Sequence, residues 1–253
     1  MLFRSAKDAR SIRLKWLARE AALASGRTEE AAARVEEVRR AVRDAYWMYR
    51  APADLVVFGR AALAIGADPK EVLEKVFASA QKADPKLRDV YLARGELALE
   101  KHDFALAAKA ADEGLKQLPD DPDLLVLRAK AFAHGAREET SASVTAALKR
   151  NPRHVPALLL RAEALIDAEA YAEAAATLDR IDAVNPAQPE AWAQRAVLAH
   201  LRGDAAGETL ARARALTPWA QNPRVDHLIG AKLSQKYRFA EGAASQRRAL
   251  AMD

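Results

Sequence analysis

Residues 89–121 read DVYLARGELALEKHDFALAAKAADEGLKQLPDD. Apolar residues recur at helical spacing from Tyr91 to Leu99 and again from Ala107 to Leu115, so each half places a stripe of apolar side chains on one helix face. The polar string Lys-His-Asp at 101–103 separates the two stripes and predicts a turn. The segment therefore predicts two consecutive helices joined by a short connection.

The same pattern recurs along the chain with a fixed period. Prolines end apolar-periodic runs at intervals of 34, 33, 34 and 32 residues, at Pro85, Pro119, Pro152, Pro186 and Pro218. Proline cannot continue a helix, so each marks the end of a second helix. Arginines beside a small residue keep the same period, at Arg94, Arg128, Arg161 and Arg195. Two independent series with one period predict a repeat protein built from helical hairpins.

This pattern resembles the tetratricopeptide repeat, a helix-turn-helix unit of about 34 residues. The family's small residue, where the two helices meet, matches Gly95, Ala129, Ala162 and Ala196. Its turn aromatic matches Phe104, Tyr171 and Phe239, and its small residue early in the second helix matches Ala107, Ala174 and Gly242. The first-helix Trp position departs from the family, holding Tyr91, Leu124, Leu158 and Trp192. The resemblance implies an all-α, right-handed superhelical solenoid that binds protein.

We expect about seven hairpins, because the repeat signal extends beyond its clear middle. An irregular hairpin at 1–50, broken at Gly26, precedes an array over 51–253. Asp68, Pro69 and Glu71 carry the residue types of a helix N-cap, first position and capping box. The expected units of the array lie near 52–85, 88–121, 122–154, 155–188, 189–220 and 223–253.

The composition excludes several classes of protein. The chain has no cysteine, which excludes disulfides and thiolate chemistry. No apolar run reaches the roughly 18 residues that span a bilayer. The net charge is +5, but acidic and basic residues alternate along the helices, which favours solvated faces over a nucleic-acid interface. Met1 to Arg13 lacks the apolar core of a secretory signal, which leaves the compartment open: the default is cytoplasmic, and the protein is exported if the native N-terminus is missing.

No residue pattern predicts catalysis, a cofactor or a metal. The five histidines, at 102, 134, 154, 200 and 227, form no i, i+4 pair and no His-Glu-x-x-His motif. Phosphate-binding glycine loops and nucleophile elbows are also missing from the sequence. The periodic arginines allow two interpretations: a basic ladder that binds a ligand, or stems that cover the hairpin while the guanidinium reaches solvent or a carboxylate. The second is favoured, and the chain is predicted not to be an enzyme.

The resemblance places the binding groove on the first helices of the hairpins, whose inner wall lines a solenoid. The residues at the family's groove positions are Asp89, Leu92, Glu96, Leu99, Glu100, Val126, Lys130, His134, Leu159, Glu163, Ile166, Asp167, Ala193, Val197, His200, Leu201, His227 and Gln235. The family's clamp for acidic chaperone tails needs Lys and Asn where Leu92 and Glu96 stand. An extended apolar or basic peptide is therefore the expected partner.

Both ends of the chain suggest a fragment. Residues 2–5, Leu-Phe-Arg-Ser, match the translation of a common sequencing adapter, so 1–5 are interpreted as a non-native scar. The unit at 223–253 has no polar capping helix after it, which predicts self-association through the apolar residues Leu233, Phe239, Ala243 and Leu250. That unit also resembles the N-terminal repeat regions of longer bacterial proteins with a zinc peptidase-like domain. The alternative function is thus an accessory arm of a larger hydrolase.

Overall fold

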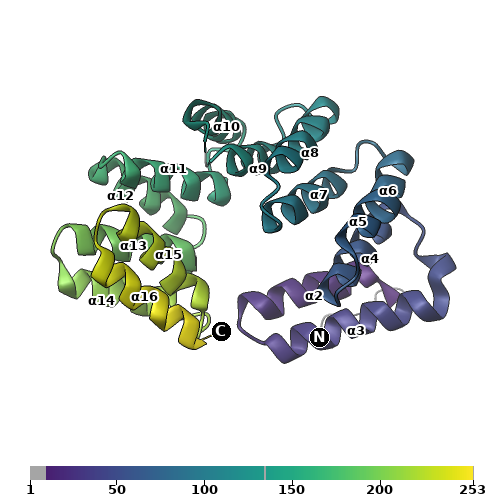
Figure 1. Ribbon diagram of the computed structural model, residues 1–253, viewed down its shortest axis with the longest axis horizontal. Coiled ribbons are helices and arrows are strands. Elements are labelled where there is room, and N and C mark those ends of the chain that lie inside the picture. Colours follow the sequence, from purple (N-terminus) through teal and green to yellow (C-terminus); the bar gives the residue numbers. More distant parts are fainter. Residues whose placement is uncertain (1–9, 134, 253) are drawn as a thin grey trace. The chain divides into compact units, whose positions relative to one another are not determined.

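The structure, a computed structural model, describes residues 10–133 and 135–252 and consists there of helices and short connections, without strands (Figure 1). The predicted scar at 1–5 and the predicted groove residue His134 lie outside the described residues. Contacts within the chain group it into two compact units, Met1–Arg150 and Asn151–Asp253, called unit 1 and unit 2 below.

Unit 1 begins with the helices α2 (Ile12–Ala24) and α3 (Thr28–Ala45), followed by the 3₁₀ turn η1 (Tyr46–Met48). The next hairpin consists of α4 (Pro52–Ala64) and a second helix in three consecutive parts: α5 (Pro69–Glu71), the π-helical segment η2 (Val72–Phe77) and α6 (Ala78–Ala83). Two further hairpins are α7 (Arg88–Glu100) with α8 (Phe104–Gln117), and α9 (Pro122–Phe132) with α10 (Arg137–Arg150).

Unit 2 contains three hairpins. They are α11 (Val155–Asp167) with α12 (Tyr171–Asp182), α13 (Pro189–Leu201) with α14 (Ala205–Ala215), and α15 (Pro223–Gln235) with α16 (Phe239–Met252). Each second helix that precedes a periodic proline ends before it, and the break predicted at 101–103 falls between α7 and α8. The predicted start of α5 is confirmed, because the Asp68 side chain accepts a hydrogen bond from the Lys70 amide.

Helices pack mainly against their hairpin partner and against the neighbouring hairpin of the same unit. In unit 1, α9 contacts both α7 and α8, and α4 contacts α2, α3 and α7. In unit 2, α13 contacts α11, α12 and α15. This confirms the predicted all-α array of stacked hairpins, in which a hairpin buries its apolar face against the next.

The small residue of the repeat pattern lies at a close contact between helices. A Cβ atom on Gly95 would lie 2.3 Å from Leu127 Cδ2, and one on Gly59 would lie 2.3 Å from Phe77 Cε1. Ala129, Ala162 and Ala196 are fully buried at the same position. The sequence pattern therefore has a steric cause: a larger side chain would separate the helices.

The turn inside a hairpin needs one residue in the left-handed region. Glycine supplies it at Gly26, Gly66 and Gly203, whereas His102, Glu169 and Tyr237 adopt φ of 58°, 60° and 60° at the same place. The following amide closes the helix end by bonding back to the last turn, as from Asp103 to the Ala98 carbonyl. The residue types of His102, Glu169 and Tyr237 do not predict this conformation.

Candidate functional site

The first helices of unit 1 line a groove of about 530 Å³. Its walls come from three consecutive hairpins: Trp16, Arg19 and Glu20 on α2; Arg60, Leu63 and Ala64 on α4; and Ala93, Glu96, Leu97 and Glu100 on α7. The turn residues Gly66, Ala67, Pro69 and Lys101 complete it. A groove formed by successive first helices is the inner surface that a helical solenoid offers to a partner.

Helix geometry explains which side chains enter this groove. Gly59 and Gly95 face the neighbouring helices, and the next residue lies about 100° further around the helix, because an α-helix has 3.6 residues per turn. That rotation brings Arg60 and Glu96 into the groove, where they form an ion pair with Nη2 and Oε2 2.7 Å apart. The ion pair connects α4 and α7 across the groove.

The accessible charge of the groove is acidic, although acids and bases are equal in number. Three acids each pair with a base and are the more exposed partner: the exposed fractions of the side chains are 49% against 21% for Glu20 and Arg19, 52% against 27% for Glu96 and Arg60, and 71% against 53% for Glu100 and Lys101. The Arg19 guanidinium is also held over the Trp16 ring, 4.4 Å from its centroid.

Apolar side chains form the floor of the groove. Trp16 and Leu97 are buried, and Leu63 is partly buried against the same core as Leu97. Carboxylates above an apolar floor provide hydrophobic contact for an apolar side chain and electrostatic attraction for a cationic one. The surface thus matches the chemistry of an extended apolar or basic peptide.

The structure brings only some of the predicted groove residues of unit 1 into this groove. Glu96 and Glu100 line it, whereas the exposed Asp89 and Lys130 and the half-buried Leu92 are not among its lining residues. Val126 is 5% exposed, so its placement in an open groove is wrong. Since α9 packs against both α7 and α8, that face of α9 belongs to the core.

In unit 2, several predicted groove residues are held by internal contacts. Lys232 on α15 is buried, and its ammonium lies 2.8 Å from Glu163 Oε1 and 3.0 Å from Asp167 Oδ1 on α11. Lys236 Nζ donates to the Asp167 carbonyl at 2.8 Å. The two carboxylates therefore share one ammonium, which offsets part of their charge, and their side chains are 42% and 36% exposed.

The remaining predicted groove residues of unit 2 are buried, hydrogen-bonded within the unit, or partly or fully exposed. Ala193, Val197 and Ile166 are fully buried, so they form the core rather than an open wall, which corrects the prediction. His227 Nδ1 lies 3.1 Å from Gln246 Oε1, and the Leu159 carbonyl accepts from Gln194. Leu201 is half-buried and Gln235 is exposed.

His200 belongs to a polar network between α13, α14, α15 and α16. Its Nδ1 lies 2.8 Å from Glu208 Oε2, and Glu208 also pairs with Arg212. Burial raises the pKa of the Glu208 carboxyl, but its hydrogen bonds to His200 and Arg212 outweigh burial, so the pKa lies below its usual value. Arg212 continues to the buried Asp226 at 2.7 Å. The His200 ring is therefore engaged in contacts between helices rather than directed to a partner in a groove.

Three of the four periodic arginines pair with carboxylates of neighbouring helices, whereas Arg161 is exposed. Arg94 bonds to Glu113 at 2.8 Å, and Arg128 to Asp112 at 3.0 Å. Arg195 contacts both Asp179 and Asp182, at 2.8 and 2.7 Å. These contacts favour the interpretation of the arginines as covers of the hairpins over that of a basic ladder.

Sequence reasoning missed the half of the groove that α2 and α4 supply. Arg60 directly follows Gly59, as Glu96 follows Gly95, so counting positions from the small residue of the 52–85 unit would have found Arg60 and, three residues on, Leu63. Trp16 and Arg19 lie in the irregular first hairpin, where no repeat signal indicates the register. Among the described residues, no group of His, Cys, Asp and Glu is arranged to hold a metal ion, and no helix is long and apolar enough to cross a membrane.

Comparison with known proteins matches part of the chain to a known repeat. Residues 131–201 match the family model described as tetratricopeptide repeat. A tetratricopeptide repeat protein from Parabacteroides merdae has a similar structure, with a TM-score of 0.60 at 18% sequence identity over 95% of this chain and 93% of that chain. A thermophilic TPR protein from Thermus thermophilus gives a TM-score of 0.58 at 18% identity, over 77% of this chain and 100% of that chain.

The comparisons support the tetratricopeptide repeat at the level of fold. The chain has the all-helical repeat architecture of these two structures. At this low sequence identity, the similarity supports a common fold and no shared function. No relative was found among curated proteins. The resemblance to repeat regions that accompany a zinc peptidase-like domain finds no support in these matches and stays a prediction.

Proposed function

We propose that this chain is a protein-binding scaffold that holds a segment of another polypeptide in the groove of unit 1. Tetratricopeptide repeats are generally non-catalytic scaffolds for protein–protein interaction, and the match at 131–201 supports that role for this chain. The observation that carries the proposal is the groove itself, in which exposed carboxylates of α2 and α7 stand above an apolar floor.

The proposed ligand is an extended segment with apolar residues and at least one lysine or arginine. An apolar side chain of the ligand would pack over Trp16 and Leu97. The lysine or arginine of the ligand would pair with Glu96 and Glu100, the most exposed acids of the groove. Unit 2 contributes less to this proposal, because the Lys232 ammonium already pairs with the carboxylates of Glu163 and Asp167. An acidic tail would be repelled by the same carboxylates.

Neutralising Glu96 and Glu100 together is expected to weaken binding of a basic, leucine-containing test peptide by about tenfold, the effect of losing a contact of roughly 1.4 kcal/mol. The peptide carries a fluorescent label, and fluorescence anisotropy reports its binding to wild type and to the Glu96→Gln/Glu100→Gln variant. Raising the salt concentration should weaken wild-type binding more than binding by the variant.

A matched control is Glu138→Gln, which removes an exposed acid of α10 outside the groove and should leave the affinity unchanged. An unlabelled acidic peptide with the same leucines should not displace the basic peptide from this groove. Displacement of the basic peptide by the acidic one, or equal losses in the groove variant and the control, would refute the groove as the binding site.

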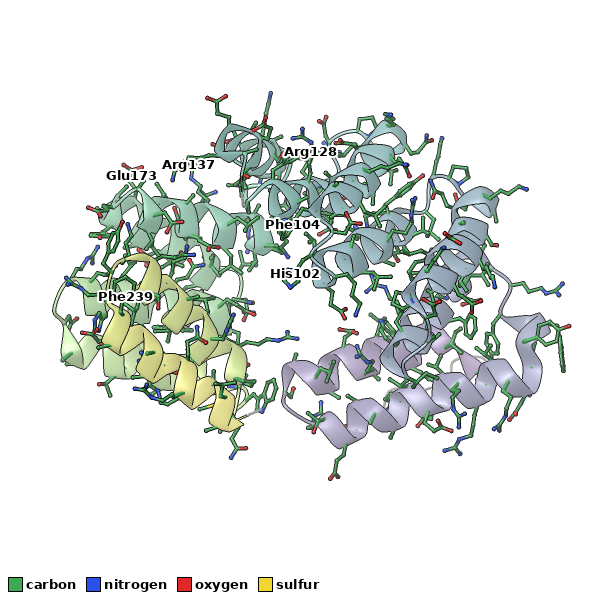
Figure 2. The ribbon with its side chains drawn as sticks, in the orientation of Figure 1. His102, Phe104, Arg128, Arg137, Glu173 and Phe239 are labelled. Carbon is green, nitrogen blue, oxygen red and sulfur yellow. The ribbon has the colours of Figure 1, made fainter. Side chains whose placement is uncertain are left out.

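A second proposal is that the last hairpin associates with a second copy of the chain. Phe239 and Leu250 on α16 are 64% and 76% exposed, whereas Phe104, the matching turn aromatic of an inner hairpin, is half-buried (Figure 2). Ala243 is exposed beside them, but Leu233 is fully buried and does not contribute, contrary to prediction. Exposed apolar side chains on one helix favour association.

Wild type is therefore expected to show a sedimentation coefficient that rises with protein concentration, since two copies can bury Phe239 and Leu250 against each other. The Phe239→Ser/Leu250→Ser variant should stay monomeric over the same range. Leu17→Ser, a change at a similarly exposed leucine on α2, should leave the association intact. A wild type that is monomeric at every concentration would rule out this proposal.

A further inference from the structure

The turn η1 carries three large apolar side chains that face solvent. Tyr46, Trp47 and Met48 are 57%, 62% and 49% exposed, and none of them is part of a core cluster. We call these three residues the aromatic turn. Three consecutive side chains of this size are costly to leave in water, so their exposure points to an interaction surface.

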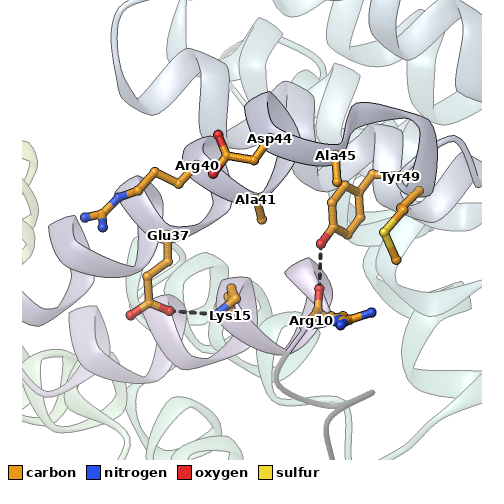
Figure 3. Close-up of a pocket in the computed structure, with 9 residues that line it drawn as sticks. Arg10, Lys15, Glu37, Arg40, Ala41, Asp44, Ala45 and Tyr49 are labelled. Atoms are coloured by element: carbon orange, nitrogen blue, oxygen red, sulfur yellow. Dashed lines mark hydrogen bonds and ion pairs between the residues drawn. The ribbon is translucent and has the colours of Figure 1, made fainter.

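The aromatic turn is held in place by contacts behind it. Tyr49 packs against the core of the first hairpin, and its hydroxyl donates to the Arg10 carbonyl at 3.0 Å (Figure 3). In the turn itself, Tyr46 and Trp47 meet edge to face with their ring centroids 5.8 Å apart, and the Arg50 guanidinium lies 5.4 Å from the Tyr46 centroid. A surface already ordered in this way loses little conformational freedom on binding.

A groove of about 530 Å³ opens beside the aromatic turn, between α2 and α3. Ala41, Ala45, Met48 and Tyr49 give it apolar walls, and Arg10, Arg40 and Asp44 also line it. Lys15 and Glu37 also line it but pair with each other at 2.9 Å, so they add no net charge. Since Arg10 and Arg40 outnumber Asp44, the groove can take an apolar side chain beside a net positive charge.

The charges around this surface are predominantly positive, and the excess consists of arginine. The exposed bases are Arg10, Arg39, Arg40, Arg43 and Arg50, which outnumber the carboxylates Glu36 and Asp44. Glu36 pairs with Arg39 and Arg40, and Asp44 pairs with Arg43. Arginine binds carboxylates through two parallel hydrogen bonds, which suits recognition of aspartate or glutamate.

We infer that the aromatic turn and the adjoining groove form a second docking surface, which binds an acidic polypeptide segment carrying an apolar anchor side chain. The anchor enters the groove against Met48 and Tyr49, Trp47 covers it, and the acidic residues of the partner meet the arginines. Tryptophan, tyrosine and arginine are the residue types that dominate protein interfaces, and methionine is enriched there too. A bounded groove with an apolar wall favours a polypeptide over a flat lipid surface.

This second surface is separate from the groove proposed above and prefers a ligand of the opposite charge. The two grooves have no lining residue in common, and the acids Glu20, Glu96 and Glu100 belong to the first alone. The two proposals can therefore fail independently, because each has its own peptide and its own variants.

The test uses the full chain and three labelled synthetic peptides of equal length. The first has leucine and phenylalanine one helical turn apart with glutamate elsewhere, the second replaces glutamate by lysine, and the third replaces the two apolar residues by serine. Only the first is expected to bind at this surface. Trp47→Ala should weaken its binding at least about tenfold, as loss of an interface hot spot does. Arg40→Gln/Arg43→Gln should weaken it and reduce its salt dependence.

Two controls separate this surface from the rest of the chain. Leu210→Ala, at a leucine that is 58% exposed on α14, should leave the affinity for the acidic peptide unchanged. Glu96→Gln/Glu100→Gln should also leave it unchanged, although that variant is expected to weaken binding of the basic peptide. Trp47 is exposed, so the Trp47→Ala variant should unfold at the same temperature as wild type, as thermal unfolding can check.

Several results would overturn the inference. Among them are displacement of the bound acidic peptide by the basic one, and an acidic peptide whose binding is insensitive to Trp47→Ala. Binding of phosphatidylglycerol vesicles or of a single-stranded oligonucleotide through Trp47, without binding of the acidic peptide, would assign the surface to lipid or nucleic acid instead. If the peptide binds only after residues 1–9 are removed, the occupant is the chain's own N-terminal segment.

Discussion

Replacing Arg212 by methionine is expected to lower the free energy of unfolding of unit 2 by about 3 kcal/mol. Arg212 donates to Asp226 at 2.7 Å, to Glu208 at 2.9 Å and to the Ser245 hydroxyl at 3.1 Å. The Asp226 side chain is only 4% exposed, so without Arg212 its carboxylate cannot recover the lost interaction from water. Methionine preserves much of the apolar stem and removes the guanidinium alone.

The expected loss of stability is near the lower end of the range for a broken buried ion pair, because Asp226 keeps one basic partner. Arg248 still lies 3.0 Å from Asp226, although its own side chain is 47% exposed. Urea unfolding and hydrogen exchange across α14, α15 and α16 measure the loss, since repeat proteins unfold in segments. Arg247→Met, at an exposed arginine of α16, should change stability by less than about 0.5 kcal/mol. Equal effects of the two changes would show that the network contributes nothing.

Replacing Gly230 by leucine is expected to cost about 3 kcal/mol or more, because α15 and α16 touch there through their backbones. A Cβ atom on Gly230 would lie 2.8 Å from the Gly242 carbonyl oxygen and 3.0 Å from Gln246 Cγ. A side chain can rotate away from such a contact, but a backbone carbonyl moves only if the helix moves. The steric cost must also exceed the roughly 1 kcal/mol by which leucine favours a helix over glycine.

A graded series tests this explanation. Gly230→Ala should be destabilising but less so than Gly230→Leu, since the first carbon already meets the carbonyl. Ala213→Leu adds a leucine on the exposed face of α14 and should stay within about 0.5 kcal/mol of wild type. Thermal unfolding and hydrogen exchange of α15 and α16 report the result. If Gly230→Leu melts with wild type, the close approach of these helices is absent in solution.

Much of the fold could be predicted from local patterns in the chain. The proline series, the small residues such as Gly95 and the break at 101–103 each report a requirement inside one hairpin, and the structure has helix ends and close contacts at those places. Helical periodicity and proline act over a few residues, so one sequence suffices to detect them. The candidate groove was predicted in part, through Glu96 and Glu100 on α7.

The other half of the groove depends on contacts between hairpins. Arg60 meets Glu96 because α4 packs against α7, and Trp16 joins them because α2 packs against α4. The burial of Val126, Ala193 and Val197 likewise follows from how first helices of successive hairpins pack. The same position in a repeat is open in one hairpin and closed in another, since packing angles depend on side chains from several helices.

The sequence by itself determined the all-helical repeat, the positions of the turns and the small residues that let helices meet, because each follows from interactions between near neighbours in the chain. Only the tertiary structure decided which charges remain available. Lys232 on α15 reaches Glu163 and Asp167 on α11 and offsets part of their charge, whereas the Glu100 side chain is 71% exposed. Tyr237 adopts a left-handed conformation, with φ of 60°, that its residue type disfavours. The hairpin turn imposes this conformation, because the bond from the Arg238 amide to the Leu233 carbonyl closes the end of α15 and outweighs a residue preference worth about 1 kcal/mol.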